Sequence, residues 1–124
     1  MIIITRVIRF VDVDRFLNRV HAVANKLNEY NFLGMGEFGS YVNYMNRCIQ
    51  LRNCGASVEA VFEQLVYAVR ALYDTCQKMG KHAVFGSVVE VLFTKTDYNI
   101  NKARVIDACI EELADIVNDI EEYL

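Results

Sequence analysis

The sequence predicts an α+β fold that is predominantly helical, with four helices and an N-terminal strand that pairs with a second short strand in the 82–95 region. Most apolar residues recur at helical spacing, the 124 residues contain no proline, and two stretches are rich in β-branched side chains. Proline breaks interior helix hydrogen bonding, so its absence suits helices, and an all-α bundle remains the alternative. Because 54% of the residues are hydrophobic, residues 1–124 can bury the core of a single domain.

The composition also indicates where the protein resides. No run of about 18 uncharged apolar residues occurs, so no membrane span is expected. Arg6 and Arg9 interrupt the apolar N-terminus, and no small-residue cleavage site follows, which argues against a signal peptide. We therefore expect a cytoplasmic protein whose four cysteines are reduced thiols.

The first expected elements are a strand and a helix. Residues 2–10 are rich in isoleucine and valine and predict the strand, which needs a partner for its backbone groups. Asp12 or Asp14 can then cap a helix over residues 14–29. His21 lies beside the apolar row of this helix, and we interpret it as a flanking residue rather than a metal ligand. The inward row of that helix contains Phe16, Val20, Val23 and Leu27.

Two further helices follow a glycine-rich loop at residues 30–40. The first is expected from Ser40 to about Asn53, with a strand over 41–52 as the alternative. The second is expected from Ser57 to Gly80, where glycine would end it. Its apolar residues step by three and four and make it the most buried helix: Val58, Val61, Phe62, Leu65, Val69, Leu72, Cys76 and Met79.

Residues 82–97 are ambiguous. The run from Val88 to Thr94 is densely β-branched and suits a strand, whereas Phe85, Val88 and Leu92 also fit one helix face. We favour the strand because the N-terminal strand needs a mate, and no other stretch supplies one.

The segment 102–124 predicts the helix that organises the fold. Three interleaved rows repeat every seven residues and form one wide apolar stripe. The rows are Ile106, Leu113 and Ile120; Cys109, Ile116 and Tyr123; and Ile110, Val117 and Leu124. The stripe either belongs to the core of the monomer or partly contacts a second copy.

Charge divides the chain unevenly. Residues 1–104 hold 13 basic and nine acidic side chains, whereas residues 105–124 hold seven acidic and no basic ones. This asymmetry could orient contacts between molecules, and an anionic protein is an unlikely ligand of nucleic acid. An acidic face of the tail helix would instead suit a basic protein; it contains Asp107, Glu111, Asp115, Asp119 and Glu122.

The loop from Leu33 to Gly39 contains Gly-x-Gly-x-x-Gly and resembles the phosphate-covering loop of protein kinases over seven residues. That resemblance would imply contacts to phosphate through backbone amides. The other kinase motifs, Ala-x-Lys, His-Arg-Asp and Asp-Phe-Gly, do not occur. A site for a nucleotide-like anion would use Gly34, Gly36, Gly39, Arg47 and Arg52.

No motif predicts catalysis, a metal or a cofactor. Cys48 and Cys54 are too far apart for a Cys-x-x-Cys site, and neither histidine completes a zinc set. Glu111 and Asp115 are expected on a solvated face, which gives paired carboxylates no contrast in environment. We therefore expect a protein that is not an enzyme.

An aromatic cluster surrounds the glycine loop and either folds over the core or recognises a partner. Aromatic residues and methionine are enriched in interface cores. The candidate partner-binding residues are Phe32, Met35, Phe38, Tyr41 and Tyr44. The favoured hypothesis is a non-enzymatic, homo-oligomeric protein-protein interaction module. An accessory or inhibitory factor that acts on another macromolecule is one form of this hypothesis. The alternatives are a small-ligand binding protein and a mimic of nucleic acid that uses the acidic helix.

Overall fold

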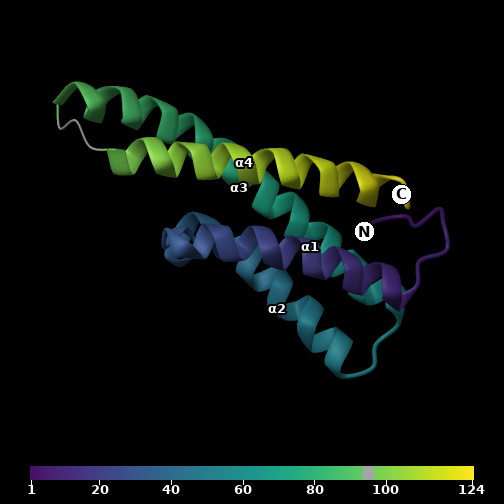
Figure 1. The fold of residues 1–124 in the computed structure, drawn as a ribbon. Helices are drawn as coiled ribbons and strands as arrows, with labels where there is room; N and C mark the ends of the chain where they lie inside the picture. The colour runs from purple at the N-terminus through teal and green to yellow at the C-terminus, as the bar shows by residue number, and fades with distance from the viewer. Residues whose placement is uncertain (94–96) are drawn as a thin grey trace.

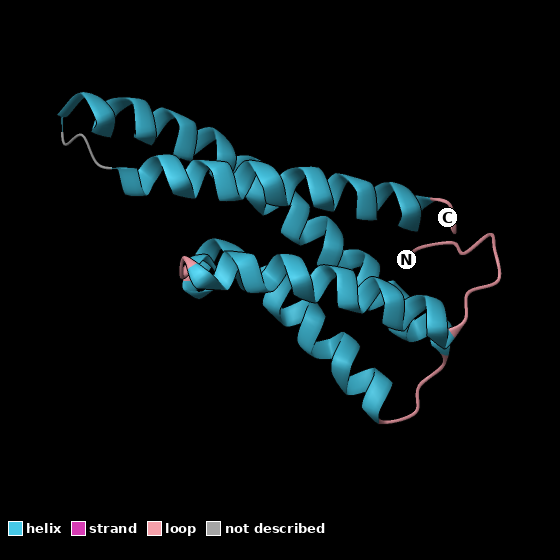
Figure 2. Cartoon of the chain, in the orientation of Figure 1, coloured by secondary structure: helices cyan, strands magenta, loops and turns pink. Residues whose placement is uncertain are grey.

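The fold is a bundle of four α-helices in a computed structural model. The structure describes the backbone of residues 1–93 and 97–124, and the side chains of residues 1–80 and 103–124. Two 3₁₀ turns lie between the first two helices (Figure 2). In chain order the elements are α1 (Phe10–Glu29), η1 (Phe32–Gly34), η2 (Gly36–Phe38), α2 (Gly39–Asn53), α3 (Val58–Phe93) and α4 (Asp97–Glu121).

The predicted α+β class is wrong, because the described residues contain no strand. Residues 1–9 precede α1 as a loop, and a backbone hydrogen bond of 2.8 Å from Thr5 N–H to the Tyr123 carbonyl ties this loop to the C-terminus. The two chain ends therefore lie close together (Figure 1). A β-rich segment without a mate cannot form a sheet, so its sequence preference is not realised as a strand.

The predicted second strand is also wrong. Residues 82–93 continue α3 as one helix, while residues 94 and 95 of the predicted strand lie outside the described part of the chain. Strand propensity is a weak preference that a growing helix overrides when no proline interrupts it. The all-α bundle, which was the alternative, is the fold observed.

The long helices α3 and α4 run side by side in opposite directions, and α1 and α2 cover one part of this pair (Figure 1). α3 packs against each of the other three helices. Its described half carries eight fully buried residues of the core: Val61, Phe62, Leu65, Val66, Ala68, Val69, Leu72 and Cys76. All the buried hydrophobic residues of the described chain form one cluster.

The start of α1 corrects the predicted cap. α1 begins at Phe10 rather than residue 14, and Asp12 lies in its first turn instead of capping it. The buried Asp12 carboxylate accepts a hydrogen bond of 3.1 Å from the Arg9 backbone N–H. Burial alone would raise the pKa of Asp12, but hydrogen bonds from the Arg9 backbone and side chain, together with the charges of Arg9 and Arg15, hold that pKa below its ordinary value of 3.8.

Gly80 does not end α3 as predicted; it lies inside the helix at a close approach to α4. A Cβ at this position would lie 2.9 Å from Ile110 Cδ1 and 3.3 Å from Ile106 Cγ2. Glycine at a helix contact lets two backbones come near each other. Gly80 therefore allows α3 to pack closely against α4 and does not end α3.

α4 confirms the predicted apolar stripe, although it begins five residues earlier than expected and ends at Glu121. Ile106, Cys109 and Leu113 are fully buried, and Ile116 and Ile120 are 2% exposed. The outer row is partly buried and packs against the core; it comprises Ile110, Val117 and Leu124. No helix in the described residues is both long and apolar enough to cross a membrane.

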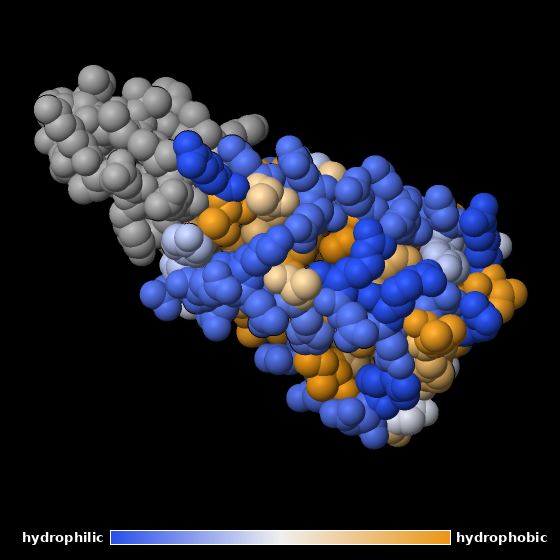
Figure 3. Space-filling view, in the orientation of Figure 1, coloured by the Kyte–Doolittle hydropathy of each residue, from blue (hydrophilic) through white to orange (hydrophobic). Residues whose placement is uncertain are grey.

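The surface around this core is largely hydrophilic on the face shown in Figure 3, with separate hydrophobic areas among the polar residues. The large apolar side chains that remain exposed in the described chain lie on the N-terminal loop, the start of α1, the segment between η1 and η2, and α2. They are Met1, Ile3, Val7, Val11, Met35, Val42 and Ile49.

Candidate functional site

The seven carboxylates from Asp107 to Glu122, on α4 and just after it, fall into two groups, and the first group is paired within the chain. Glu112 accepts a hydrogen bond of 2.6 Å from Lys26, and Asp119 accepts one of 2.6 Å from Arg19. These two pairs join α4 to α1. On the other flank Glu121 bonds Arg70 of α3 at 2.8 Å, and Glu122 lies 3.8 Å from Arg6.

The second group consists of Asp107, Glu111 and Asp115, which we call the α4 acidic row. Their spacing of four residues places them on one stripe of the helix, and all three are exposed. None forms an ion pair within the described part of the chain. Of the five residues predicted for the acidic face, the structure leaves these three available and engages Asp119 and Glu122.

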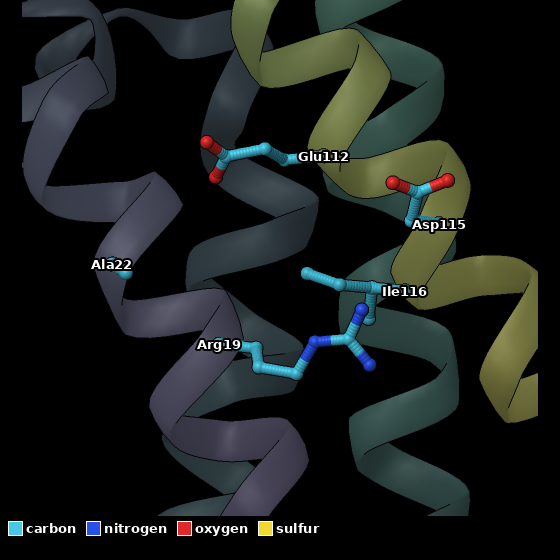
Figure 4. A pocket seen from close by; sticks show the side chains of 5 residues that line it. All are labelled: Arg19, Ala22, Glu112, Asp115 and Ile116. Carbon is cyan, nitrogen blue, oxygen red and sulfur yellow. The ribbon is translucent and has the colours of Figure 1, made fainter.

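A hollow of about 240 Å³ lies between α1 and α4 beside this row. Figure 4 shows Arg19 and Ala22 on α1 facing Glu112, Asp115 and Ile116 on α4. Ala22 is small enough to leave space, and the nearly buried Ile116 gives the hollow an apolar surface. Carboxylates and an apolar surface together suit the stem and head of a lysine or arginine side chain.

The ion pairs beside the hollow are partly exposed, which limits their strength. The Lys26 and Glu112 side chains are 47% and 45% exposed. The hydrogen bond and charge of Glu112 raise the pKa of Lys26 above its ordinary value of 10.5, so this cation is retained at neutral pH. Half-exposed ion pairs of this kind contribute little to the stability of the fold.

Sequence reasoning missed the roles of Arg19, Lys26 and the hollow. Arg19 and Lys26 are seven residues apart, as are Glu112 and Asp119. Matching sevenfold spacings of opposite charge are what two antiparallel helices need to form two ion pairs across one interface. That match was the available signal.

The predicted aromatic cluster is divided between core and surface. Phe32, Phe38 and Tyr41 are buried, and burial raises the pKa of Tyr41 to about 12. Met35 is 40% exposed. Tyr44 is half-buried, with its ring centroid 5.5 Å from that of Tyr67. The cluster therefore folds largely over the core, and two of its five residues reach the surface.

The predicted anion site is not assembled in the structure. Gly34 and Gly36 lie in the two 3₁₀ turns and Gly39 begins α2. Arg52 lies near the other end of α2, about 20 Å along the helix axis from Gly39. Arg52 instead approaches Asp14 at 3.4 Å and stacks over the Phe10 ring at 4.2 Å.

Arg47, the other arginine predicted for that site, is about 12 Å along α2 from Gly39. Its guanidinium lies 5.9 Å from the Tyr44 ring centroid. The structure thus brings neither arginine to the glycine loop.

The cysteines are four free thiols with different surroundings. Burial raises the pKa of Cys48 and Cys109 to about 11 and that of Cys76 to about 12, whereas Cys54 is exposed. The three buried thiols remain protonated at neutral pH, which makes them poor nucleophiles. Within the described residues, no group of three or more His, Cys, Asp or Glu side chains could hold a metal ion.

A second hollow, of about 340 Å³, lies where η2 meets α3 and is lined by Glu37, Thr75, Lys78 and Met79. Thr75 donates a hydrogen bond of 3.3 Å to the Glu37 carbonyl. This contact ties η2 to α3. The hollow is lined by one acidic and one basic side chain, so charges of one sign do not converge on it.

Comparison with known protein families, curated proteins and solved structures gave no match to this chain.

Proposed function

We propose that the protein is a non-enzymatic interaction module that binds a basic surface of another protein through the α4 acidic row. The observation that carries this proposal is the division of the α4 carboxylates. Glu112, Asp119, Glu121 and Glu122 are neutralised by cations of the chain itself, whereas the acidic row is exposed and forms no ion pair with any side chain that the structure describes.

The geometry of the row supports a protein ligand. Asp107 and Asp115 are eight residues apart, about 12 Å along the helix. Two or three lysine or arginine side chains of one protein segment can span that length. The hollow beside Asp115 can take an aliphatic stem next to Ile116, while the Asp115 carboxylate lies near the charged head. The two other charged groups of the lining are already paired, Glu112 with Lys26 and Arg19 with Asp119.

Charge also supports this class of partner. The formal net charge of −3 and the three carboxylates of the acidic row repel nucleic acid and attract basic proteins. Because long-range attraction acts mainly on the association rate, the binding should be fast and sensitive to salt. An accessory or inhibitory role would follow if the row covers a basic functional surface of its partner.

The test compares two triple variants with the same change in net charge. In the first, Asp107→Asn, Glu111→Gln and Asp115→Asn neutralise the acidic row. In the matched control, three other exposed carboxylates without an ion pair are neutralised: Glu29→Gln, Glu37→Gln and Glu59→Gln.

A lysine-rich peptide of about ten residues serves as the probe, and its dissociation constant is measured by titration at several salt concentrations. We expect the row variant to bind roughly tenfold more weakly and with a smaller salt slope, because three partly exposed contacts each contribute a fraction of a kcal/mol to 1 kcal/mol. The control should bind like the native chain. Equal losses in both variants would show that only net charge matters and would refute the row as a site.

A further inference from the structure

A second exposed stripe lies on α2. Unlike the acidic row, it consists of apolar and amide side chains and carries no charge. Val42, Asn46, Ile49 and Asn53 follow one another at steps of four, three and four residues, which is the spacing of a coiled-coil seam. We call these four residues the α2 seam. Val42 is 36% exposed and Ile49 is 38% exposed, and both asparagines are exposed.

The α2 seam is separate from the faces that α2 already uses. Tyr41, Met45 and Cys48 are buried toward the core, and Tyr44 lies against Tyr67 of α3. On a helical projection the seam lies beyond Met45, on the flank opposite Tyr44. The described part of the chain provides no hydrogen-bond partner for the Asn46 and Asn53 side chains.

We propose that the α2 seam is the contact between two copies of this chain, with α2 of one copy packed against α2 of the other. A twofold contact brings the same surface from both copies together, so that surface must be complementary to itself. Apolar side chains meet this condition. Side-chain amides also do, because each amide both donates and accepts hydrogen bonds.

Charge favours a second copy over a foreign partner of either sign. Residues 39–53 contain no Asp or Glu, and the Arg52 guanidinium is compensated by Asp14. The other cation of α2, Arg47, lies 5.9 Å from the Tyr44 ring centroid, on the flank opposite the seam. Two α2 helices can therefore approach without bringing carboxylates together. The α4 acidic row has the opposite property, since a surface of one sign repels its own copy.

Size sets the strength of this contact. The 15 residues of α2 extend over about 22 Å, and the seam over about 16 Å. A single pair of helices of this length buries less than a standard interface of about 1,600 Å². The dimer is therefore weak and forms as the protein concentration rises, which permits regulation by expression level.

Sedimentation velocity over a range of concentrations tests the proposal. We expect the native chain to form a dimer, and the variant carrying Val42→Glu and Ile49→Glu to dimerise roughly tenfold more weakly or not at all, because charge would be buried without a partner. The matched control carries Val7→Glu and Val11→Glu, at positions that are 86% and 62% exposed outside α2. The control should dimerise like the native chain.

Circular dichroism establishes that each variant is folded before its mass is compared. A native chain that stays monomeric up to about 1 mM would overturn the proposal. So would a control variant that loses dimerisation while the seam variant keeps it, because that result would place the contact on the N-terminal loop.

A cross-link adds a readout of position. Asn46→Cys places a thiol near the middle of the seam, and Cys54→Ser in the same chain removes the exposed native thiol. Near the middle of the seam, the two introduced thiols lie close together whether the two α2 helices run parallel or antiparallel. Mild oxidation should join the two copies through a disulfide. Asn25→Cys on the exposed side of α1 is the control and should remain monomeric. Cross-linking at residue 25 without cross-linking at residue 46 would contradict the α2 contact. The outcome is independent of whether the acidic row binds a basic partner.

Discussion

α4 contacts its two neighbours in different ways. Toward α3 it buries Ile106, Cys109 and Leu113, and Gly80 lets the two helices come close. Toward α1 it uses the ion pairs Lys26–Glu112 and Arg19–Asp119 beside a hollow of about 240 Å³. The described contact with α3 is largely apolar, with the Arg70–Glu121 ion pair at the end of α4, whereas the contact with α1 carries two ion pairs and is partly open.

This difference between the two sides of α4 suggests that the α3 side stabilises the fold and that the α1 side takes part in binding. Buried apolar area stabilises the fold in proportion to the surface removed from water. Half-exposed ion pairs contribute little to stability, because water competes for both charges. We therefore expect substitutions on the α3 side to change the free energy of unfolding, and substitutions on the α1 side to change binding.

The largest loss should follow Leu113→Ala on the α3 side. Leu113 is fully buried, so its truncation leaves a cavity and should lower the free energy of unfolding by about 2–5 kcal/mol. Urea titration followed by circular dichroism measures it. The partly buried Val117, one turn further along α4, is the control, and Val117→Ala should cost less. A Leu113→Ala loss no greater than that of the control would mean that this interface is not well packed.

Gly80→Leu should produce the next largest effect at the same interface. Its side chain would have to displace Ile110 and Ile106, and overpacking of this kind costs about 1–3 kcal/mol. Gly80→Ala is the instructive comparison. It gains up to about 1 kcal/mol of helix propensity and needs only a small shift of Ile110, so the two terms nearly cancel. Equal stability of both variants in thermal unfolding would argue against a close approach at residue 80.

The helices were predictable because their apolar spacing is set by the geometry of the bundle. The stripe from Ile106 to Ile120 has one physical solution, which is a helix with that side buried. The segments 2–10 and 82–93 were assigned wrongly because β-branched residues report only a local preference. Whether a strand finds a partner depends on the whole fold, and no single segment contains that information.

The candidate site was predictable only in part. The acidic composition of the tail identified Asp107, Glu111 and Asp115 as exposed residues, and the structure places them so. Which carboxylates are engaged depends on where α1 lies, and this position is tertiary information. The burial of Phe32 and Phe38 has the same origin, because a composition that suits a partner interface also suits a core.

Asp12→Ala should have a smaller effect, at the start of α1. It removes the acceptor of the Arg9 backbone N–H, and the loss of such a contact should lower Tm by roughly 3–6 °C. The pKa of Asp12 is lowered in the folded state, so its contribution is present above 3.8 and is lost as the pH falls through the lower folded pKa. The difference in Tm between the native chain and the variant should therefore shrink in strong acid. A difference that grows on acidification would contradict the lowered pKa.

The smallest effect should come from Lys26→Met on the α1 side, which keeps an unbranched apolar chain and removes the charge. Because this ion pair is half exposed, Tm should fall by less than about 2 °C, and the difference should vanish at high salt. Glu112 raises the pKa of Lys26, so the contribution is present below 10.5 and is lost as the pH rises through the higher folded pKa.

The same variant should strengthen binding of the lysine-rich peptide, because it frees the Glu112 carboxylate beside the hollow. Arg70→Met is the matched control, since it frees Glu121 on the opposite flank of α4. Stronger binding in the Lys26 variant alone would localise the basic ligand to the side of α4 that faces α1. If Lys26→Met greatly lowered stability and left binding unchanged, the α1 side of α4 would serve stability rather than binding, contrary to our expectation.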